Sequence, residues 1–255
     1  MTDHLYLESS GGVARLVIDR AAKRNAFDQA MWERFPGLVD AAMADPAVRI
    51  LIVGSGSGPF CAGADIGEFA THAADPAWRE RNNAAIRATQ VTLARGPKPT
   101  CAAIDGDCIG GGLGIALACD VRLASPRARF GLTPAKLGLV YPLHDTKLLI
   151  DVVGPSQAKR MLFTARTFDA AEALRLGLID DLADDLAAAV DDFSVRVVAL
   201  SPTTQLAAKA IVRRILDGAS DDDADSAGQF DSAFDSPDFA EGVAAFLAKR
   251  PPRFT

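Results

Sequence analysis

The sequence of 255 residues lacks several features, and each absence excludes a class of protein. Basic residues are in the minority, because 27 Lys and Arg stand against 33 Asp and Glu, for a formal net charge of −6 at pH 7. Nucleic acids and anionic membrane surfaces attract basic faces, so this charge balance argues against both as partners. No run of about 18 apolar residues occurs, which is the length that a membrane-spanning helix needs. We therefore expect a globular protein that binds neither nucleic acid nor membrane.

Histidine and cysteine are scarce as well. The chain has three histidines and four cysteines, no two histidines stand at ligand spacing, and no Cys-x-x-Cys pair occurs. We therefore predict no metal site and no disulfide framework. The first residues, Met1 to His4, also lack a basic start followed by an apolar run, so a cytoplasmic location is expected.

The hydrophobic pattern predicts a mixed protein in which strands and helices alternate. Strands are predicted over residues 13–18, 48–53, 101–104 and 121–124. A helix is expected from about Trp78 to Arg95, where Gly96 and Pro97 end it. From Asp145 onward strand signals nearly vanish and helices follow one another. The fold class is therefore α/β (α+β), with no linker-like boundary between the mixed part and the helical part.

Two glycine-rich segments follow predicted strands. Gly54 to Gly58 suggests a nucleotide-binding loop, but it lacks the third glycine of the dinucleotide fingerprint and is not followed by a helix, so a flexible turn is favoured. The second segment, Gly110 to Gly112, stands before an apolar helical run. Its backbone N–H groups, at a helix N-terminus, suit an anion or a developing oxyanion. Close packing of the helix against a neighbouring backbone is an equally good interpretation.

Several segments in order resemble the crotonase (enoyl-CoA hydratase/isomerase) superfamily over nearly the whole chain. Residues 20–26 are similar to the family's early segment, which closes over the nucleotide of coenzyme A (CoA). Residues 60–66, Phe-Cys-Ala-Gly-Ala-Asp-Ile, match a family signature closely. Residues 106–120 match its glycine-rich helix start and Cys-Asp ending, and residues 239–250 resemble its final helix.

The resemblance implies a fold, an assembly and a reaction class. Residues 1–195 would form a ββα-spiral core that binds acyl-CoA. Residues 196–255 would form a C-terminal helical trimerisation region that packs on the core and on neighbouring subunits, in a homotrimer or a dimer of trimers. The substrate would arrive as a CoA thioester, with no other cofactor. The enzyme would be a lyase or isomerase of fatty acid metabolism.

The resemblance also implies which residues bind the substrate. The N–H groups of Ala64 and Gly111 would form an oxyanion hole around the thioester carbonyl. Further contacts to CoA are expected from Lys23, Arg24, Ala62, Asp65 and Ile66, and from Phe246 and Lys249 supplied by a neighbouring subunit. For the basic residues, a solvated surface position is an even alternative. Asp65 is also expected to hold the turn behind the oxyanion hole.

The chain departs from the family pattern at two positions that carry the chemistry. The hydratases of the family hold and activate water with two glutamates, and here those positions are Gly114 and Pro134. Neither residue transfers protons, so the usual hydratase mechanism is not encoded at its usual places. An atypical hydration, a thioester hydrolysis and a CoA-ester-binding protein without catalysis therefore remain open. A nicotinamide-dependent oxidoreductase would rest on Gly54 to Gly58 alone.

Residues nearby are candidates to replace the glutamates. The segment from Thr133 to Tyr141 partly resembles the methylmalonyl-CoA decarboxylase branch of the superfamily, although the active-site histidine of that branch is Ala64 here. Decarboxylation needs a donor for the carboxylate and an oxyanion hole, and Tyr141 would be the donor unless it is only a pocket wall. His144 is an acid–base residue, an ordinary polar residue or a helix cap, and Asp145 is expected to be a helix N-cap.

Overall fold

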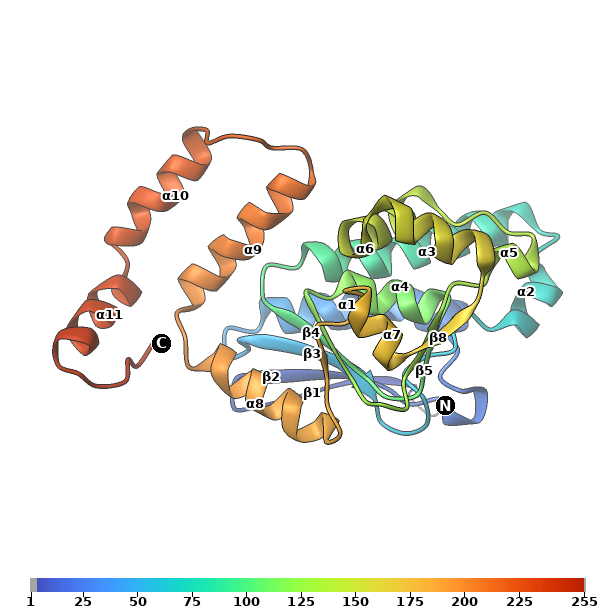
Figure 1. The fold of residues 1–255 in the computed structure, drawn as a ribbon, viewed down its shortest axis with the longest axis horizontal. Coiled ribbons are helices and arrows are strands. Elements are labelled where there is room, and N and C mark those ends of the chain that lie inside the picture. Colours follow the sequence, from blue (N-terminus) through green and yellow to red (C-terminus); the bar gives the residue numbers. More distant parts are fainter. Residues whose placement is uncertain (1–3, 255) are drawn as a thin grey trace.

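The computed structural model describes residues 4–254 and shows two β-sheets covered by helices (Figure 1). The larger sheet has six strands in the order β1-β2-β3-β4-β6-β9. Its strands are β1 Leu5–Ser10, β2 Val13–Ile18, β3 Ile50–Ser55, β4 Thr100–Ile104, β6 Val121–Ala124 and β9 Asp181–Leu182. The first two strands form an antiparallel hairpin, and every later pair is parallel. The four strands predicted from the hydrophobic pattern are thus confirmed.

The smaller sheet lies next to the ends of β3 and β4, beside the loop that contains Ala64 and the start of the glycine-rich helix. Its three strands are β5 Asp107–Ile109, β7 Arg129–Gly131 and β8 Thr167–Asp169. An isolated bridge between Cys61 and Cys108 joins the loop after β3 to β5. The signature segment that contains Ala64 is therefore held beside the strand that leads into the glycine-rich helix.

Strand β3 is the most apolar of the predicted strands, because both of its faces are covered. Leu51 and Val53 belong to the main core under the helices, whereas Ile50 and Ile52 belong to a second core on the opposite face. A parallel strand buried on both sides reads as a continuous apolar run. The second core is closed by helix α8, Leu186–Val198, through residues that include Val190.

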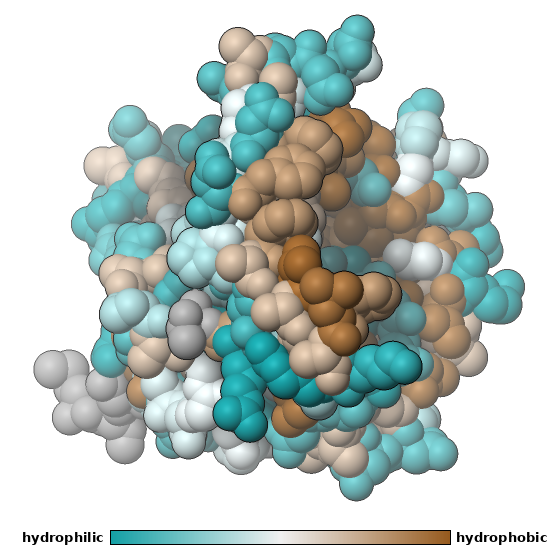
Figure 2. Space-filling view, turned by 90° about the vertical axis from the view of Figure 1, so that its left-hand side faces the viewer, coloured by the Kyte–Doolittle hydropathy of each residue, from teal (hydrophilic) through white to brown (hydrophobic). Residues whose placement is uncertain are grey.

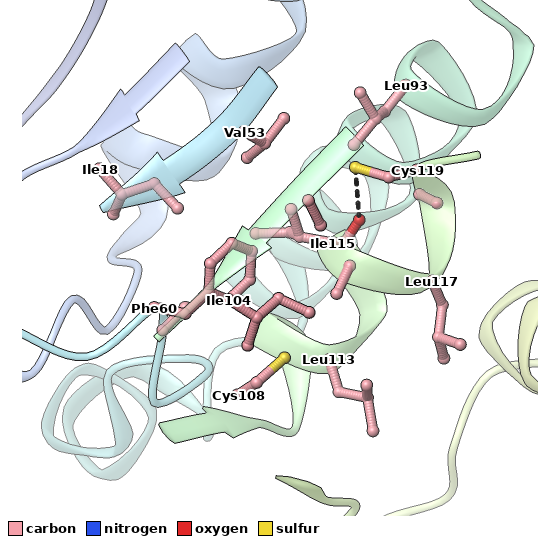
Figure 3. Close-up of a cluster of buried hydrophobic side chains, with 14 of the residues drawn as sticks. Ile18, Val53, Phe60, Leu93, Ile104, Cys108, Leu113, Ile115, Leu117 and Cys119 are labelled. Atoms are coloured by element: carbon pink, nitrogen blue, oxygen red, sulfur yellow. Dashed lines mark hydrogen bonds between the residues drawn. The ribbon is translucent and has the colours of Figure 1, made fainter. Parts of the chain in front are cut away.

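The main core lies between the sheet and a layer of helices. These are α1 Gln29–Ala44, α3 Pro76–Arg95, α4 Gly111–Ala118 and α6 Leu143–Thr164, the last broken at Gly154. Helix α4 is buried from Gly112 to Ala118, and Figure 3 shows Leu113 and Ile115 packed with Phe60 and Cys108. Shorter helices complete the body: η1 Ala21–Lys23, α2 Ile66–His72, α5 Pro134–Leu137 and α7 Ala170–Arg175.

The three C-terminal helices form an arm that stands away from the body in Figure 1. They are α9 Pro202–Leu216, α10 Ala224–Phe234 and α11 Pro237–Leu247. Helix α9 is tied to the body by Lys209, whose Nζ lies 2.7 Å from an oxygen of Asp120. Figure 2, which looks onto this side of the molecule, shows apolar surface along the arm. Phe230 and Phe246 of the arm are 67% and 82% exposed.

Within residues 4–254, no helix is long and apolar enough to cross a membrane.

Candidate functional site

The loop after β3 places the N–H of Ala64. The N–H of Phe27 donates to the carbonyl of Gly63, and the N–H of Asp65 donates to the carbonyl of Phe27, both at 2.8 Å. These two bonds flank Ala64 and leave its own N–H facing away from Phe27, as alternation along an extended segment requires. Gly63 has φ +98, and a Cβ there would lie 2.8 Å from the carbonyl oxygen of Ile109. Only glycine therefore fits this turn.

The start of helix α4 places the N–H of Gly111 beside that of Ala64. Gly110 N–H donates to the carbonyl of Gly131 at 2.9 Å, and the first bond of the helix runs from Gly114 N–H to the carbonyl of Gly110. A Cβ built on Gly111 would lie 3.7 Å from the nitrogen of Ala64 and 3.0 Å from the ring of Trp32. Within the described part of the chain, neither Ala64 N–H nor Gly111 N–H donates a hydrogen bond.

Two neighbouring free donors at a helix N-terminus are suited to one oxygen that gains negative charge. The glycine segment contains residues of two kinds. Gly112 is a packing glycine, because a Cβ there would lie 2.4 Å from the carbonyl oxygen of Cys61. Gly111 instead presents its N–H. The structure therefore brings Ala64 and Gly111 together as the sequence predicted.

The side chain of Asp65 fixes the loop directly after Ala64. Its carboxylate caps helix α2 by accepting from Gly67 N–H at 3.0 Å, and it also accepts from Arg20 at 3.0 Å. Burial alone would raise the pKa of Asp65, but the hydrogen bonds from Arg20 and Gly67 hold it below its usual value. Asp65 thus ties the loop to the start of α2 and to Arg20.

The other residues expected to contact CoA lie in different surroundings. Lys23 is exposed, with its Nζ 4.0 Å from Asp65, whereas Arg24 pairs with the buried Asp107. Ala62 N–H is bound to the carbonyl of Arg24, and Ile66 is half exposed at the start of α2. Ala62 and Ile66 thus belong to the segment that carries Ala64, and Lys23 and Arg24 contact that segment.

Phe246 and Lys249 lie on the arm instead, at and just after the end of α11. In Figure 1 the arm stands apart from the body, so the fold of one chain does not bring these two residues to Ala64 and Gly111.

Gly114, the position that the family resemblance assigns to the first glutamate, is surrounded by other side chains. A Cβ on Gly114 would lie 2.5 Å from Nε2 of Gln90 and 3.7 Å from the hydroxyl of Tyr141. Gln90 belongs to α3 and is 1% exposed. The sequence pattern does not reveal Gln90, because a glutamine within an amphipathic helix shows nothing of the helix that it faces. Gly114 was the one available indication that a neighbouring side chain fills this position, since a glycine leaves space for one.

Tyr141 and His144 come from the segment that leads into α6. The Tyr141 hydroxyl is buried without a hydrogen-bond partner among the described residues, and burial, with Asp145 and Cys108 nearby, raises its pKa well above the usual value. His144 has a buried Nε2, also unpartnered in the described chain. Burial, followed by the charges of nearby arginines and Lys147, lowers the pKa of His144.

Asp145 is not the helix cap that the sequence suggested. Helix α6 begins at Leu143, so Pro142 is the N-cap and Asp145 lies in the first turn. Its side chain turns inward, the residue is 4% exposed, and Oδ1 has no partner within residues 4–254. Burial raises the pKa of Asp145 to about 6, against a lowering by the Gln90 side chain.

The first glycine-rich segment of the sequence, Gly54 to Gly58, lies elsewhere. It lines a cavity of about 800 Å³ near the start of α8, and neither Ala64 nor Gly111 lines that cavity. The segment continues into the loop before α2 rather than into a phosphate-binding helix.

Comparison with known proteins gives consistent results. Residues 8–255 match the family described as enoyl-CoA hydratase/isomerase. A crotonyl-CoA hydratase from Syntrophomonas wolfei is 32% identical over 259 residues, which cover 99% of this chain and 98% of that protein. A probable enoyl-CoA hydratase from Mycobacterium bovis is 32% identical over 254 residues, 98% of this chain and 97% of that one.

A solved structure extends the likeness to three dimensions. It is a putative enoyl-CoA hydratase/isomerase family protein from Hyphomonas neptunium, 39% identical, with a TM-score of 0.97 over 100% of this chain and 98% of that one. The fold expected from the resemblance is thereby confirmed. On these matches and on the geometry above, this chain belongs to the enoyl-CoA hydratase/isomerase family and has the crotonase fold.

Proposed function

We propose that the protein is an acyl-CoA enzyme that binds the thioester carbonyl oxygen between the N–H groups of Ala64 and Gly111. The observation that carries the proposal is the adjacency of the Ala64 and Gly111 N–H groups, which donate no hydrogen bond within residues 4–254. The relatives support the substrate class, since one of them is a crotonyl-CoA hydratase.

The chemistry follows from where negative charge develops. Removing a proton or a carboxylate from the carbon beside a thioester leaves an enolate, whose charge resides largely on the oxygen. Two preorganised N–H groups stabilise that oxygen more in the transition state than in the ground state, which is the condition for catalysis. One such donor contributes roughly 3–4 kcal/mol in comparable sites.

Residues outside the oxyanion hole would bind CoA and form the assembly. Lys23, Arg24, Ala62 and Ile66 would contact CoA, and Asp65 would hold the loop. Phe246 and Lys249 would reach CoA from a neighbouring subunit, which requires a homotrimer or a dimer of trimers. Residues 1–195 would be the acyl-CoA-binding core and residues 196–255 the region of assembly. The enzyme would be a cytoplasmic lyase or isomerase with no cofactor besides the CoA of its substrate.

Decarboxylation of an acyl-CoA is a second candidate, favoured by one observation. The buried Tyr141 hydroxyl, unpartnered in the described part of the chain, stands near Gly114 and would donate to a substrate carboxylate. Hydrolysis of the thioester and binding without turnover remain alternatives to it.

An assay of the purified protein on crotonyl-CoA, on methylmalonyl-CoA and on saturated thioesters tests the proposal. We expect binding of CoA esters and turnover of at least one of them, with crotonyl-CoA hydration well below that of a hydratase with both glutamates. Efficient crotonyl-CoA hydration would contradict the importance of Gly114 and Pro134. Absence of both binding and turnover across the panel would refute the proposed function.

A further inference from the structure

Three polar side chains from separate elements meet beside Gly114. Gln90 comes from α3, Tyr141 from the segment before α6, and Asp145 from the first turn of α6. Each keeps one buried oxygen without a hydrogen-bond partner among residues 4–254: Oε1 of Gln90, the hydroxyl of Tyr141 and Oδ1 of Asp145. Unsatisfied buried polar groups are rare and costly in native proteins, so three together call for an explanation beyond folding.

The place of the cluster relative to Ala64 and Gly111 follows from helix geometry. Gly111 and Gly114 are three positions apart in α4 and therefore lie on the same face, with Cβ positions about 5–6 Å apart. The Gly111 end of that face is 3.7 Å from the nitrogen of Ala64, and the Gly114 end is 3.7 Å from the Tyr141 hydroxyl. The cluster thus lies about one helical turn from the paired donors.

We propose that Asp145 is the general acid–base residue of this enzyme, working beside Tyr141 and Gln90 next to Gly114. This inference rests on the proposed function, because it needs a thioester carbonyl held by Ala64 and Gly111.

The step is a proton transfer at the carbon next to the thioester carbonyl. The Asp145 carboxylate takes a proton from that carbon, and the C–H electron pair becomes the C=C bond of the enolate. The carbonyl π pair moves onto the oxygen, which Ala64 and Gly111 hold. The carboxylic acid then returns a proton to the same carbon or to another carbon of the enolate system.

Among the neighbouring groups, Asp145 is the one suited to this task. The amide of Gln90 does not titrate, and Tyr141 stays protonated because its pKa is raised well above the usual value. His144 responds to a different set of charges, namely Arg87 and Arg95 of α3, Arg213 of α9 and Lys147 of α6. Asp145 instead interacts with Gln90 and Tyr141, the two side chains nearest to Gly114. Burial brings its pKa to about 6, close to the pH at which an acid–base residue works well.

Exchange of the α-protons of butyryl-CoA in D₂O, followed by NMR, tests this step without requiring the natural substrate. For Asp145→Asn we expect a loss of roughly 10²- to 10⁴-fold in exchange rate. Butyryl-CoA affinity, measured by calorimetry, should change less than about twofold, since the oxyanion hole is intact. In the wild type the rate should rise with pH through about 6, and that dependence should vanish in the variant.

Two further variants make the test specific. Asp151→Asn is the matched control, because Asp151 lies on the same helix but pairs with Lys147 at 2.7 Å, and we expect it to leave exchange unchanged. Tyr141→Phe keeps the ring and removes the unpartnered hydroxyl, and it should slow exchange with the fold intact. It serves as the second variant if Asp145→Asn does not fold.

The outcomes separate this inference from the proposed function. Full exchange by Asp145→Asn, or a wild-type protein that binds butyryl-CoA without exchanging its protons, overturns the role of Asp145 and leaves acyl-CoA binding standing. A wild-type protein that neither binds nor turns over any thioester refutes the proposed function and this inference with it.

Discussion

At the scale of single residues, the proposed chemistry depends on backbone N–H groups, and a proline substitution removes one of them. Gly111 is the first residue of α4, a position that tolerates proline. Gly111→Pro should lower kcat/KM on the best thioester by roughly 10²- to 10³-fold, because one oxyanion-hole donor is lost. Gly111→Ala is the matched control, since it adds the same Cβ against Trp32 but keeps the N–H. Equal losses in the two variants would assign the effect to crowding.

The raised pKa of Asp145 should also make the stability of the protein depend on pH. Its folded-state pKa of about 6 lies above the ordinary value of 3.8, so the folded state retains a proton that the unfolded state releases. Its contribution to the free energy of unfolding should therefore fall as pH rises from about 4 to 6, by at most about 3 kcal/mol. Urea unfolding at pH 4 and pH 7 checks this. The free energy of unfolding of Asp145→Asn, relative to that of the wild type, should be higher at pH 7 than at pH 4. The same difference between variant and wild type at both pH values would contradict the prediction.

A substitution at Gly114 tests how much room α3 leaves beside α4. Gly114→Glu directs a buried carboxylate at the amide of Gln90, which is 2.5 Å from where the Cβ would lie. We expect a loss of about 1–3 kcal/mol in the free energy of unfolding, as for overpacked cores. Adding Gln90→Ala should recover part of it, so that a double-mutant cycle gives a coupling above about 0.5 kcal/mol. Purely additive effects would show that the two side chains do not compete for this space.

At the scale of elements, the loop that carries Ala64 is held by a helix cap. Asp65→Ala removes both the cap of α2 and the partner of Arg20, and should cost about 1–3 kcal/mol of stability and lower kcat as Ala64 shifts. Asp75→Ala is the control, because Asp75 caps α3 through Ala77 N–H at 2.9 Å but does not belong to the loop. Thermal unfolding and thioester turnover distinguish the two. An equal effect on kcat would argue against positioning by Asp65.

Sequence patterns predicted the elements that bury apolar surface, and missed those held by tertiary contacts. The strand over 48–53 and the helix from Trp78 to Arg95 are recognisable because periodicity and capping residues act locally. Strands β5, β7 and β8 are too short to show alternation, each having three residues. The donors Ala64 and Gly111 followed from glycine motifs and family resemblance. The inward orientation of the Asp145 side chain could not be predicted from the sequence, because it depends on α6 starting directly after Pro142 and on the side chains of α3.

At the scale of the whole molecule, the exposed apolar surface of the arm predicts assembly. Phe246 and Leu247 are 82% and 76% exposed, which is costly in a monomer. Light scattering on the wild type should give the mass of a trimer or a hexamer, and Phe246→Asp should shift it toward smaller species. Asp231→Ser, at an exposed polar position on α10, is the control and should not change the mass. A monomeric wild type would contradict the assembly and the contribution of Phe246 and Lys249 to a neighbour's site.

The contact between Gln90 and the surface of Gly114 has an evolutionary consequence. A glutamate on α4 and a long amide inward from α3 compete for one volume, so one side chain must move aside for the other. Homologues should therefore divide into two groups that co-vary at these positions: one with a carboxylate on α4 and a small or retracted residue on α3, the other with glycine facing a bulky polar side chain. Conversion from one group to the other passes through an intermediate that is either overpacked or hollow. Ancestral sequences between the groups should accordingly change both positions almost together.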